Sequence, residues 1–227
     1  MPWPKSKHRL NLEAFTKPLT AEAKYWVGFL LADGCVSAGS HGYGTVCLRL
    51  KFSDAEHVRK FARFVGVLEE SVREYTEKST WGYGHGVQLQ FAGKELVGQL
   101  AEYNVIPRKS GKEVVEESLA LDPDFWRGML DGDGSLSMVL RKPYPRPYPW
   151  ITLCGSNDVV SRFVDYLFVI TGFKPSISSC RSIFQTALAG KKARVAISNI
   201  YPVGCDPVLE RKMVLAKAII DWRSKDE

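Results

Sequence analysis

The sequence is poor in the features that define several protein classes. Its 227 residues include only five cysteines and four histidines, and no two cysteines form a C-x-x-C motif. An odd number of scattered cysteines, without zinc-like spacing to the histidines, argues against a disulfide scaffold and against a structural zinc site. We expect reduced, mostly buried thiols in an intracellular protein.

Long apolar runs and extremes of charge are missing as well. No apolar stretch reaches the roughly 18 residues of a membrane span, and no signal-peptide pattern occurs. These absences predict a soluble protein without a membrane partner. The apolar fraction of 45% supports a folded core. The net charge of +6 is spread over both halves of the chain, which suits nucleic acid but also ordinary enzymes.

What the sequence does contain is an internal repeat. Residues 25–37 read YWVGFLLADGCVS, and residues 125–137 read FWRGMLDGDGSLS, so the two segments align without gaps. The triplet AGK also occurs in both halves, and so does a lysine in the segments IPRKS and LERKM. A supersecondary unit that is used twice predicts one molecule with pseudo-twofold symmetry. We expect its halves at residues 1–115 and 116–227.

Hydrophobic periodicity predicts the order helix, two strands, helix, two strands, helix in each half. In the first half we expect helices at 21–32, after Ser53 or Asp54, and at 94–103, with strands at 46–52, 70–78 and 86–91. In the second half we expect helices from 123 and at 158–171, 191–199 and 208–223, with strands at 136–141, 150–153, 176–180 and 183–188. The predicted fold class is α/β of the α+β type, with two antiparallel sheets that form a saddle.

Both repeats end a hydrophobic helix in an acidic residue, Asp33 in the first and Asp133 in the second. The C-terminal end of a helix is already partly negative, so a carboxylate there is unfavourable unless something compensates. If the two helices met, the carboxylates would repel each other, and a divalent cation would relieve the repulsion. Mg²⁺ suits such a site because it is held by few carboxylates and keeps several waters.

Small residues predict that the two helices do meet. Gly28 and Ala32 lie four residues apart, as do Gly128 and Gly132. Residues at this spacing share one helix face, so small side chains there allow another helix to approach closely. The backbone carbonyls of Ala32 and Gly132, which are left unpaired at the helix ends, could add ligands to the metal.

Two other interpretations of the D-G-D-G pattern remain to be weighed. A single copy could be a simple turn, but two copies at matching places in a repeat argue against a turn. A calcium-binding structural protein is excluded by ligand count, because neither copy continues as an EF-hand loop.

The segments WVGFLLADG (26–34) and WRGMLDGDG (126–134) resemble the nonapeptide of the LAGLIDADG homing endonucleases in their single-chain form. The repeated layout extends the resemblance over nearly the whole chain. It implies a metal-dependent endonuclease that hydrolyses one phosphodiester per strand in a long asymmetric double-stranded DNA target. It also implies a monomer that needs no protein partner and is encoded by a mobile element such as an intron. The implied cofactor is Mg²⁺, with Mn²⁺ able to substitute and Ca²⁺ binding without supporting cleavage.

The resemblance assigns roles to individual residues. Asp33 and Asp133 occupy the penultimate position of the motif, which implies that they are catalytic metal ligands. Lys109 and Lys212 match basic residues beyond each third helix, where a lysine can stabilise charge on the scissile phosphate or tune the attacking water.

Two positions depart from the motif of the family or from its symmetry. Leu31 replaces the first acidic residue of the motif, whereas Asp131 keeps it. We therefore expect Asp131 to belong to the helix end or to a solvent network and not to bind metal directly. Arg127 replaces a small residue, so we expect it to point away from the contact between the helices.

Polar side chains on the outward faces of the strands are the predicted DNA contacts. Arginine can bind guanine and glutamine can bind adenine through two hydrogen bonds, while serine and threonine bind bases or phosphate. The predicted residues are Arg49, Lys51, Arg73, Tyr75, Gln88, Gln90, Ser137, Arg141, Trp150, Thr152, Ser178, Arg181 and Gln185. The alternative function is an RNA-splicing maturase, or a DNA-binding regulator of the same fold that does not cut.

Overall fold

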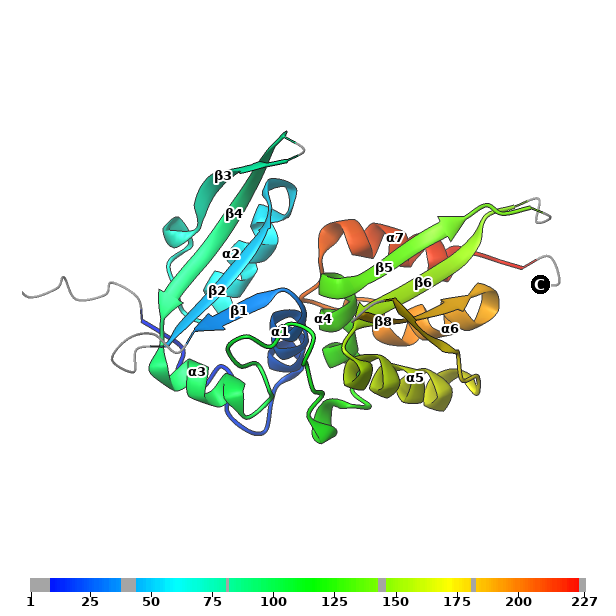
Figure 1. Ribbon diagram of the computed structural model, residues 1–227, viewed down its shortest axis with the longest axis horizontal. Helices are drawn as coiled ribbons and strands as arrows, with labels where there is room; N and C mark the ends of the chain where they lie inside the picture. Colours follow the sequence, from blue (N-terminus) through cyan, green and yellow to red (C-terminus); the bar gives the residue numbers. More distant parts are fainter. Residues whose placement is uncertain (1–8, 38–43, 81, 143–145, 181–182, 225–227) are drawn as a thin grey trace, which may run out of the picture.

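The computed structural model describes residues 9–37, 44–80, 82–142, 146–180 and 183–224. Its strands form two four-stranded antiparallel sheets with the orders β1-β2-β4-β3 and β5-β6-β8-β7. The same order in both sheets matches the repeat in the sequence, and the predicted mixed fold with two antiparallel sheets is confirmed. Helices α1 and α4 lie together at the centre, with one sheet on each side of them (Figure 1).

The elements of the first half follow the predicted order. They are α1 (Ala21–Ala32), β1 (Gly34–Ser37), β2 (Thr45–Lys51), α2 (Ala55–Phe64), β3 (Arg73–Ser79), β4 (Gly82–Ala92) and α3 (Lys94–Ala101). Strand β1 has only four residues, and the sequence analysis assigned it no bounds. It pairs with β2 and continues directly from the end of α1.

The second half repeats this order and adds a last helix. Its elements are α4 (Pro123–Asp133), β5 (Gly134–Val139), β6 (Tyr148–Gly155), α5 (Asn157–Thr171), β7 (Ile177–Cys180), β8 (Ile183–Ala189), α6 (Gly190–Ile200) and α7 (Glu210–Asp221). Helices α5 and α6 cover one face of the second sheet (Figure 1).

Capping side chains set where several helices begin. Thr20 accepts a hydrogen bond from the Ala23 amide, and Asp122 accepts from the amides of the first turn of α4. Such caps satisfy amides that have no partner within the helix. Asp54 also stands at a helix start, but its side chain makes no cap. It accepts from Arg211 Nε at 3.0 Å instead, which links the first half to the start of α7.

Helices α1 and α4 approach each other at two glycines. A Cβ added at Gly28 would lie 2.2 Å from the carbonyl oxygen of Phe125, and one added at Gly128 would lie 2.1 Å from that of Tyr25. No side chain fits into either gap, so the backbones touch here. The flanking Trp26 is completely buried in the core. This contact fixes the ends of the two helices relative to each other.

Candidate metal and DNA site

The two acidic residues lie at the touching ends of α1 and α4. Asp33 is the C-terminal cap of α1, and Asp133 is the last residue of α4. A Cβ added at Gly132 would lie 2.4 Å from Ala32 Cβ and 3.4 Å from Asp33 Oδ2. The side chain of Asp33 therefore lies against the end of the helix that carries Asp133.

Each carboxylate has a raised pKa. Both side chains reach solvent, yet enough protein surrounds each carboxylate to remove part of its hydration. This desolvation raises the pKa of Asp133 to about 6, and repulsion from Asp33 adds to the effect. Desolvation also raises the pKa of Asp33, while Lys109 and Lys212 oppose the rise. A cation between the carboxylates would favour their ionised forms.

The two lysines are buried and bind backbone carbonyls at the same helix ends. Lys109 Nζ donates to the Ala32 carbonyl at 3.2 Å. Lys212 Nζ donates to the Leu130 carbonyl at 2.9 Å and also to the carbonyl of Gly134. Burial lowers the pKa of Lys212 to about 8 and lowers that of Lys109 as well. Each lysine thus lies close to the carboxylates with its ammonium group held in a defined place.

The donor atoms at this centre suit a small, hard cation. Within the described ranges, no cluster of three or more histidine, cysteine, aspartate or glutamate side chains could hold a metal. The available donors are two carboxylates and the carbonyl groups of Gly132 and Ala32. The Ala32 carbonyl is not unpaired as expected, because it already accepts from Lys109. Mg²⁺ fits so sparse an oxygen set, because it keeps waters and takes remaining ligands from a phosphate. A structural zinc site would need more nitrogen or sulphur ligands than these residues offer.

The predicted polar residues of the first sheet share its open face. Arg49 is paired with Gln88 on β4, and Gln88 is paired with Arg73 on β3, so the three form one row across the sheet. The guanidinium of Arg49 lies 5.5 Å from the ring centre of Tyr75. Arg73 and Gln88 also line a shallow hollow together with Gln90. Lys51 is exposed at the end of β2.

The second sheet carries a different set on its open face. Trp150 Nε1 donates to Thr152 Oγ1 at 3.1 Å, and the guanidinium of Arg141 lies 4.8 Å from the centre of a Trp150 ring. Ser178 is paired with Gln185 across β7 and β8, and both are exposed. The half-buried Ser137 is paired with Trp150. The remaining predicted residue, Arg181, lies outside the described residues.

Cysteines share these open faces, although mostly buried thiols were expected. Cys35 is exposed and is paired directly with Cys47, which neighbours Arg49 on the same face of β2. Cys154 is half-buried and is paired with Gln185. The expectation of mostly buried thiols was wrong for these residues. The alternation of residues 46–52 contained the signal, because it places Cys47 on the same side as Arg49.

Asp131 agrees in part with its prediction, and Arg127 does not. Asp131 lies in the last turn of α4, as expected, but its side chain is completely buried and does not reach solvent. Arg127 is 1% exposed, and its guanidinium lies 5.3 Å from the ring centre of Tyr25 on α1. It was therefore wrong to expect Arg127 to point away from the neighbouring helix. Its charge is matched by Asp124 at 2.7 Å, and its Nε donates to the Pro207 carbonyl.

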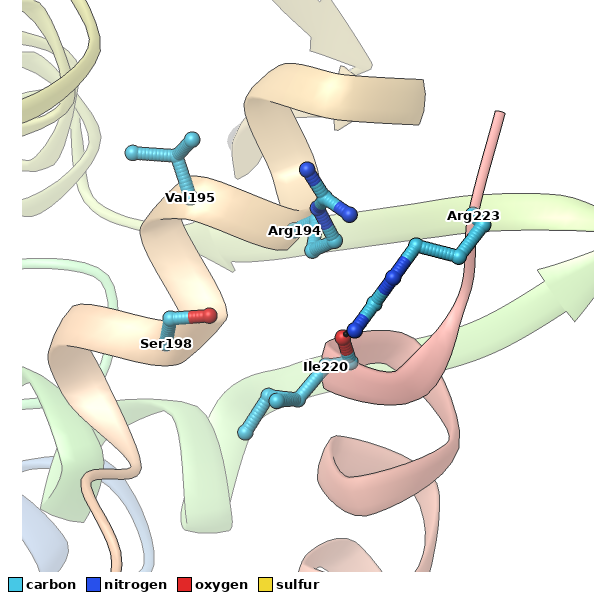
Figure 2. A pocket seen from close by; sticks show the side chains of 5 residues that line it. All are labelled: Arg194, Val195, Ser198, Ile220 and Arg223. Carbon is cyan, nitrogen blue, oxygen red and sulfur yellow. Dashed lines mark hydrogen bonds between the residues drawn. The ribbon is translucent and has the colours of Figure 1, made fainter. Parts of the chain in front are cut away.

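A separate hollow lies between α6 and α7 (Figure 2). Arg194 and Arg223 point into it, but both donate to the carbonyl of Trp222, and Arg223 also donates to that of Ile220. Cations at a helix C-terminus satisfy the carbonyls that the helix leaves unpaired. The two arginines therefore satisfy backbone carbonyls at the C-terminal end of α7 and do not belong to the acidic centre.

Comparison with solved structures identifies the architecture. The homing endonuclease I-WcaI, solved bound to its DNA recognition sequence, matches with a TM-score of 0.61 over 94% of this chain and 93% of that one, at 12% identity. The LAGLIDADG homing endonuclease I-GzeII, in complex with its DNA target, matches with a TM-score of 0.53 over 88% of both chains, at 12% identity. The chain has the LAGLIDADG homing-endonuclease fold.

The LAGLIDADG meganuclease I-AabMI, bound to uncleaved DNA, gives a third match. Its TM-score is 0.52 over 89% of this chain and 92% of that one, at 12% identity. No family model matches the sequence, and a search of curated proteins gives no match. In the described part of the chain, no helix is both long and apolar enough to span a membrane. The three matches cover most of both chains, so a single chain contains the LAGLIDADG fold.

Proposed function

We propose that this protein is a site-specific double-stranded DNA endonuclease that acts as a monomer and depends on a divalent cation. One observation carries the proposal. The paired ends of α1 and α4 hold Asp33 and Asp133 between two sheets whose open faces are polar. Solved proteins of this fold include homing endonucleases bound to their DNA targets.

The sheets supply the recognition surface. A strand rises about 3.3 Å per residue, so the eleven residues of β4 are long enough to follow about one turn of B-DNA. Arg49 and Gln88 on the first sheet and Gln185 on the second are chemically suited to reading base edges. Arg73 and Arg141 are suited to phosphates as well. The two faces carry different residues, so the target is asymmetric.

The acidic centre supplies the chemistry. Asp33 and Asp133 hold Mg²⁺, with Mn²⁺ able to replace it and Ca²⁺ supporting binding but not cleavage. When bound, the cation supplies Lewis acidity that stabilises charge on the oxygens of the scissile phosphodiester. The carbonyls of Ala32 and Gly132 are the further oxygen donors. Lys109 and Lys212 place positive charge beside the phosphate, where it stabilises the transition state for cutting each strand once.

The test uses a plasmid that carries the uninterrupted insertion site of the gene for this protein. We expect wild type to linearise the plasmid with Mg²⁺ and to bind without cutting in Ca²⁺. Asp133→Asn keeps the shape of the side chain and removes its charge, so cutting should fall by at least about a hundredfold while DNA binding in Ca²⁺ persists. Gln185→Glu is a control on the open face, which should weaken binding without abolishing cutting of the bound DNA.

Tight and specific binding without cleavage under any metal would contradict the endonuclease proposal. The protein would then be a maturase or a DNA-binding regulator of the same fold. Binding of the unspliced intron RNA in the same assay would distinguish the maturase from the regulator.

A further inference from the structure

Asp131 is a buried carboxylate that accepts three hydrogen bonds from distant parts of the chain. Tyr25 donates to Oδ2 at 2.7 Å, Tyr201 donates to Oδ1 at 2.8 Å, and the amide of Leu209 donates to Oδ2 at 2.7 Å. Burial raises the pKa of Asp131 to about 6, and the three donors oppose that rise. All three partners are donors, so this site is built for an acceptor.

The Leu209 amide connects Asp131 to the start of α7. Leu209 is the N-terminal cap of α7, and its carbonyl accepts from the amides of Lys212 and Met213. Its side chain cannot cap the helix, so the position of this first turn depends on its backbone contacts. Asp131 fixes Leu209, and Leu209 fixes the turn that carries Lys212.

Lys212 in turn contacts the end of α4, the helix that carries Asp131. Its ammonium group donates to the carbonyls of Leu130 and Gly134, which flank Asp131 and Asp133. The contacts form a closed ring that runs from α4 through Asp131 to Leu209, along one turn of α7, and back through Lys212 to the end of α4. A second tie holds the same turn, because Arg211 pairs with Asp54 of the first half at 3.0 Å.

Among the described residues of the first half there is no equivalent ring. Leu31 occupies the position that corresponds to Asp131, and it is completely buried among apolar residues. Lys109 lies in a loop and not on a helix, and the neighbouring Arg108 adopts a positive φ of 57°. Its ammonium group donates to the carbonyl of Ala32 at 3.2 Å. The two lysines therefore occupy similar places but are held by different structures.

We propose that Asp131 is a positioning residue for Lys212. Cleavage of one DNA strand then depends on the closed ring of contacts between α4 and the first turn of α7. This inference rests on the proposed function and deepens it. Each lysine serves the phosphodiester nearer to its own half. Loss of the Asp131 contacts shifts the first turn of α7 and displaces Lys212, while Lys109 stays in place. A displacement of about 1 Å at a reacting centre can cost up to a hundredfold in rate.

The experiment measures the nicking rate of each strand separately, with each strand of a linear target labelled at its 5′ end. Lys212→Met and Lys109→Met first assign one strand to each lysine. Asp131→Asn should slow the strand assigned to Lys212 by roughly tenfold or more relative to the other strand. DNA that is nicked only in the other strand should therefore accumulate.

Two further variants keep the test informative if Asp131→Asn folds poorly. Tyr201→Phe removes one hydrogen-bond donor to Asp131 and keeps the aromatic side chain, so nicking of the same strand should slow by about fivefold. Tyr166→Phe is the matched control, because Tyr166 is a buried tyrosine that donates to Asn199 and not to Asp131. It should leave the ratio of the two nicking rates unchanged.

A readout without DNA separates this inference from the proposed function. Amide hydrogen exchange should become faster in the first turn of α7 in Asp131→Asn and should stay unchanged in α5. Equal slowing of both strands, or unchanged exchange in α7, would overturn the positioning role. Absence of cutting by wild type, together with faster exchange in α7, would overturn the endonuclease and leave the structural link between Asp131 and Lys212 standing.

Discussion

His57 is a histidine that the surrounding core keeps neutral. Its ring lies 4.9 Å from that of Trp26 and 4.8 Å from that of Phe29, and its Nε2 lies 2.9 Å from Tyr25 Oη. Burial lowers the pKa of His57 to about 3, and the positive charge of Lys60 contributes. Tyr25 donates its proton to Asp131, so its oxygen accepts from His57 Nε2–H.

The neutral histidine predicts a dependence of stability on pH. In the unfolded chain His57 binds a proton below about pH 6.5, whereas in the fold it does so only below about pH 3. Between these values the unfolded state binds more protons, so this residue lowers stability as the pH falls, by up to about 1.4 kcal/mol per pH unit. The change that removes this effect is His57→Phe, which fills the same aromatic space.

We expect His57→Phe to destabilise the protein by about 1 kcal/mol at pH 7.5, because Tyr25 loses a donor. The difference in unfolding free energy should nearly vanish at pH 6 and be reversed, by about 1 kcal/mol, at pH 5. Urea unfolding at the three pH values measures it. A difference that grows as the pH falls would show that His57 is charged in the fold.

At the scale of residues, the sequence could predict the roles that the repeat displays twice. Asp33 and Asp133 stand at matching places, and so do Lys109 and Lys212, so a single alignment suggests a common centre. The repeat could not explain Asp131, whose partners are spread over more than a hundred residues and have no equivalent around Leu31 in the part of the chain that the structure describes. A buried acceptor for three donors is visible only when the chain is folded.

Helices α1 and α4 form the central contact of the molecule, and its glycines predict a sharp sensitivity to size. Gly128→Ala would place a methyl group 2.1 Å from the Tyr25 carbonyl oxygen, and backbone atoms cannot move aside as a side chain can. We expect a loss of about 3 kcal/mol or more in unfolding free energy. Urea unfolding of the purified variant measures this loss.

The control for Gly128→Ala is another glycine within a helix. Gly98 lies in α3, and an added Cβ would meet nothing within 4 Å. Gly98→Ala should therefore stabilise the protein by roughly 0.5–1 kcal/mol, because alanine loses less conformational freedom in a helix. Similar effects of both substitutions would contradict close packing at the central contact.

At the scale of elements, the long periodic segments were predictable and the short ones were not. The helix at 21–32 agrees with α1 at both ends, because Thr20 provides a cap and the acidic motif follows. Strand β1 is too short for alternation to be read, and it exists because β2 offers a partner. The start of α7 at Glu210 is set by Asp131 and not by a local cap, so the predicted start at 208 was only approximate.

The whole molecule combines a symmetric frame with unlike surfaces. The sheets have the same strand order, but the paired row of Arg49, Gln88 and Arg73 in one corresponds to a row of Cys154, Gln185 and Ser178 in the other, without an arginine. Ion pairs also join the halves, with Lys24 to Asp122 at 2.7 Å as one example. The frame therefore holds two different recognition surfaces in one fixed relation.

This asymmetry predicts how the protein distinguishes DNA targets. A target in which one half-site is replaced by an inverted copy of the other keeps every phosphate but presents the wrong bases to one sheet. Each mismatched base pair costs about 1–3 kcal/mol, so either symmetric target should bind at least about a hundredfold more weakly than the natural one. The dependence of log Kd on log salt should keep nearly the same slope, because that slope reports phosphate contacts. Fluorescence anisotropy in Ca²⁺ measures both quantities, and equal affinity for a symmetric target would mean that one sheet does not read sequence.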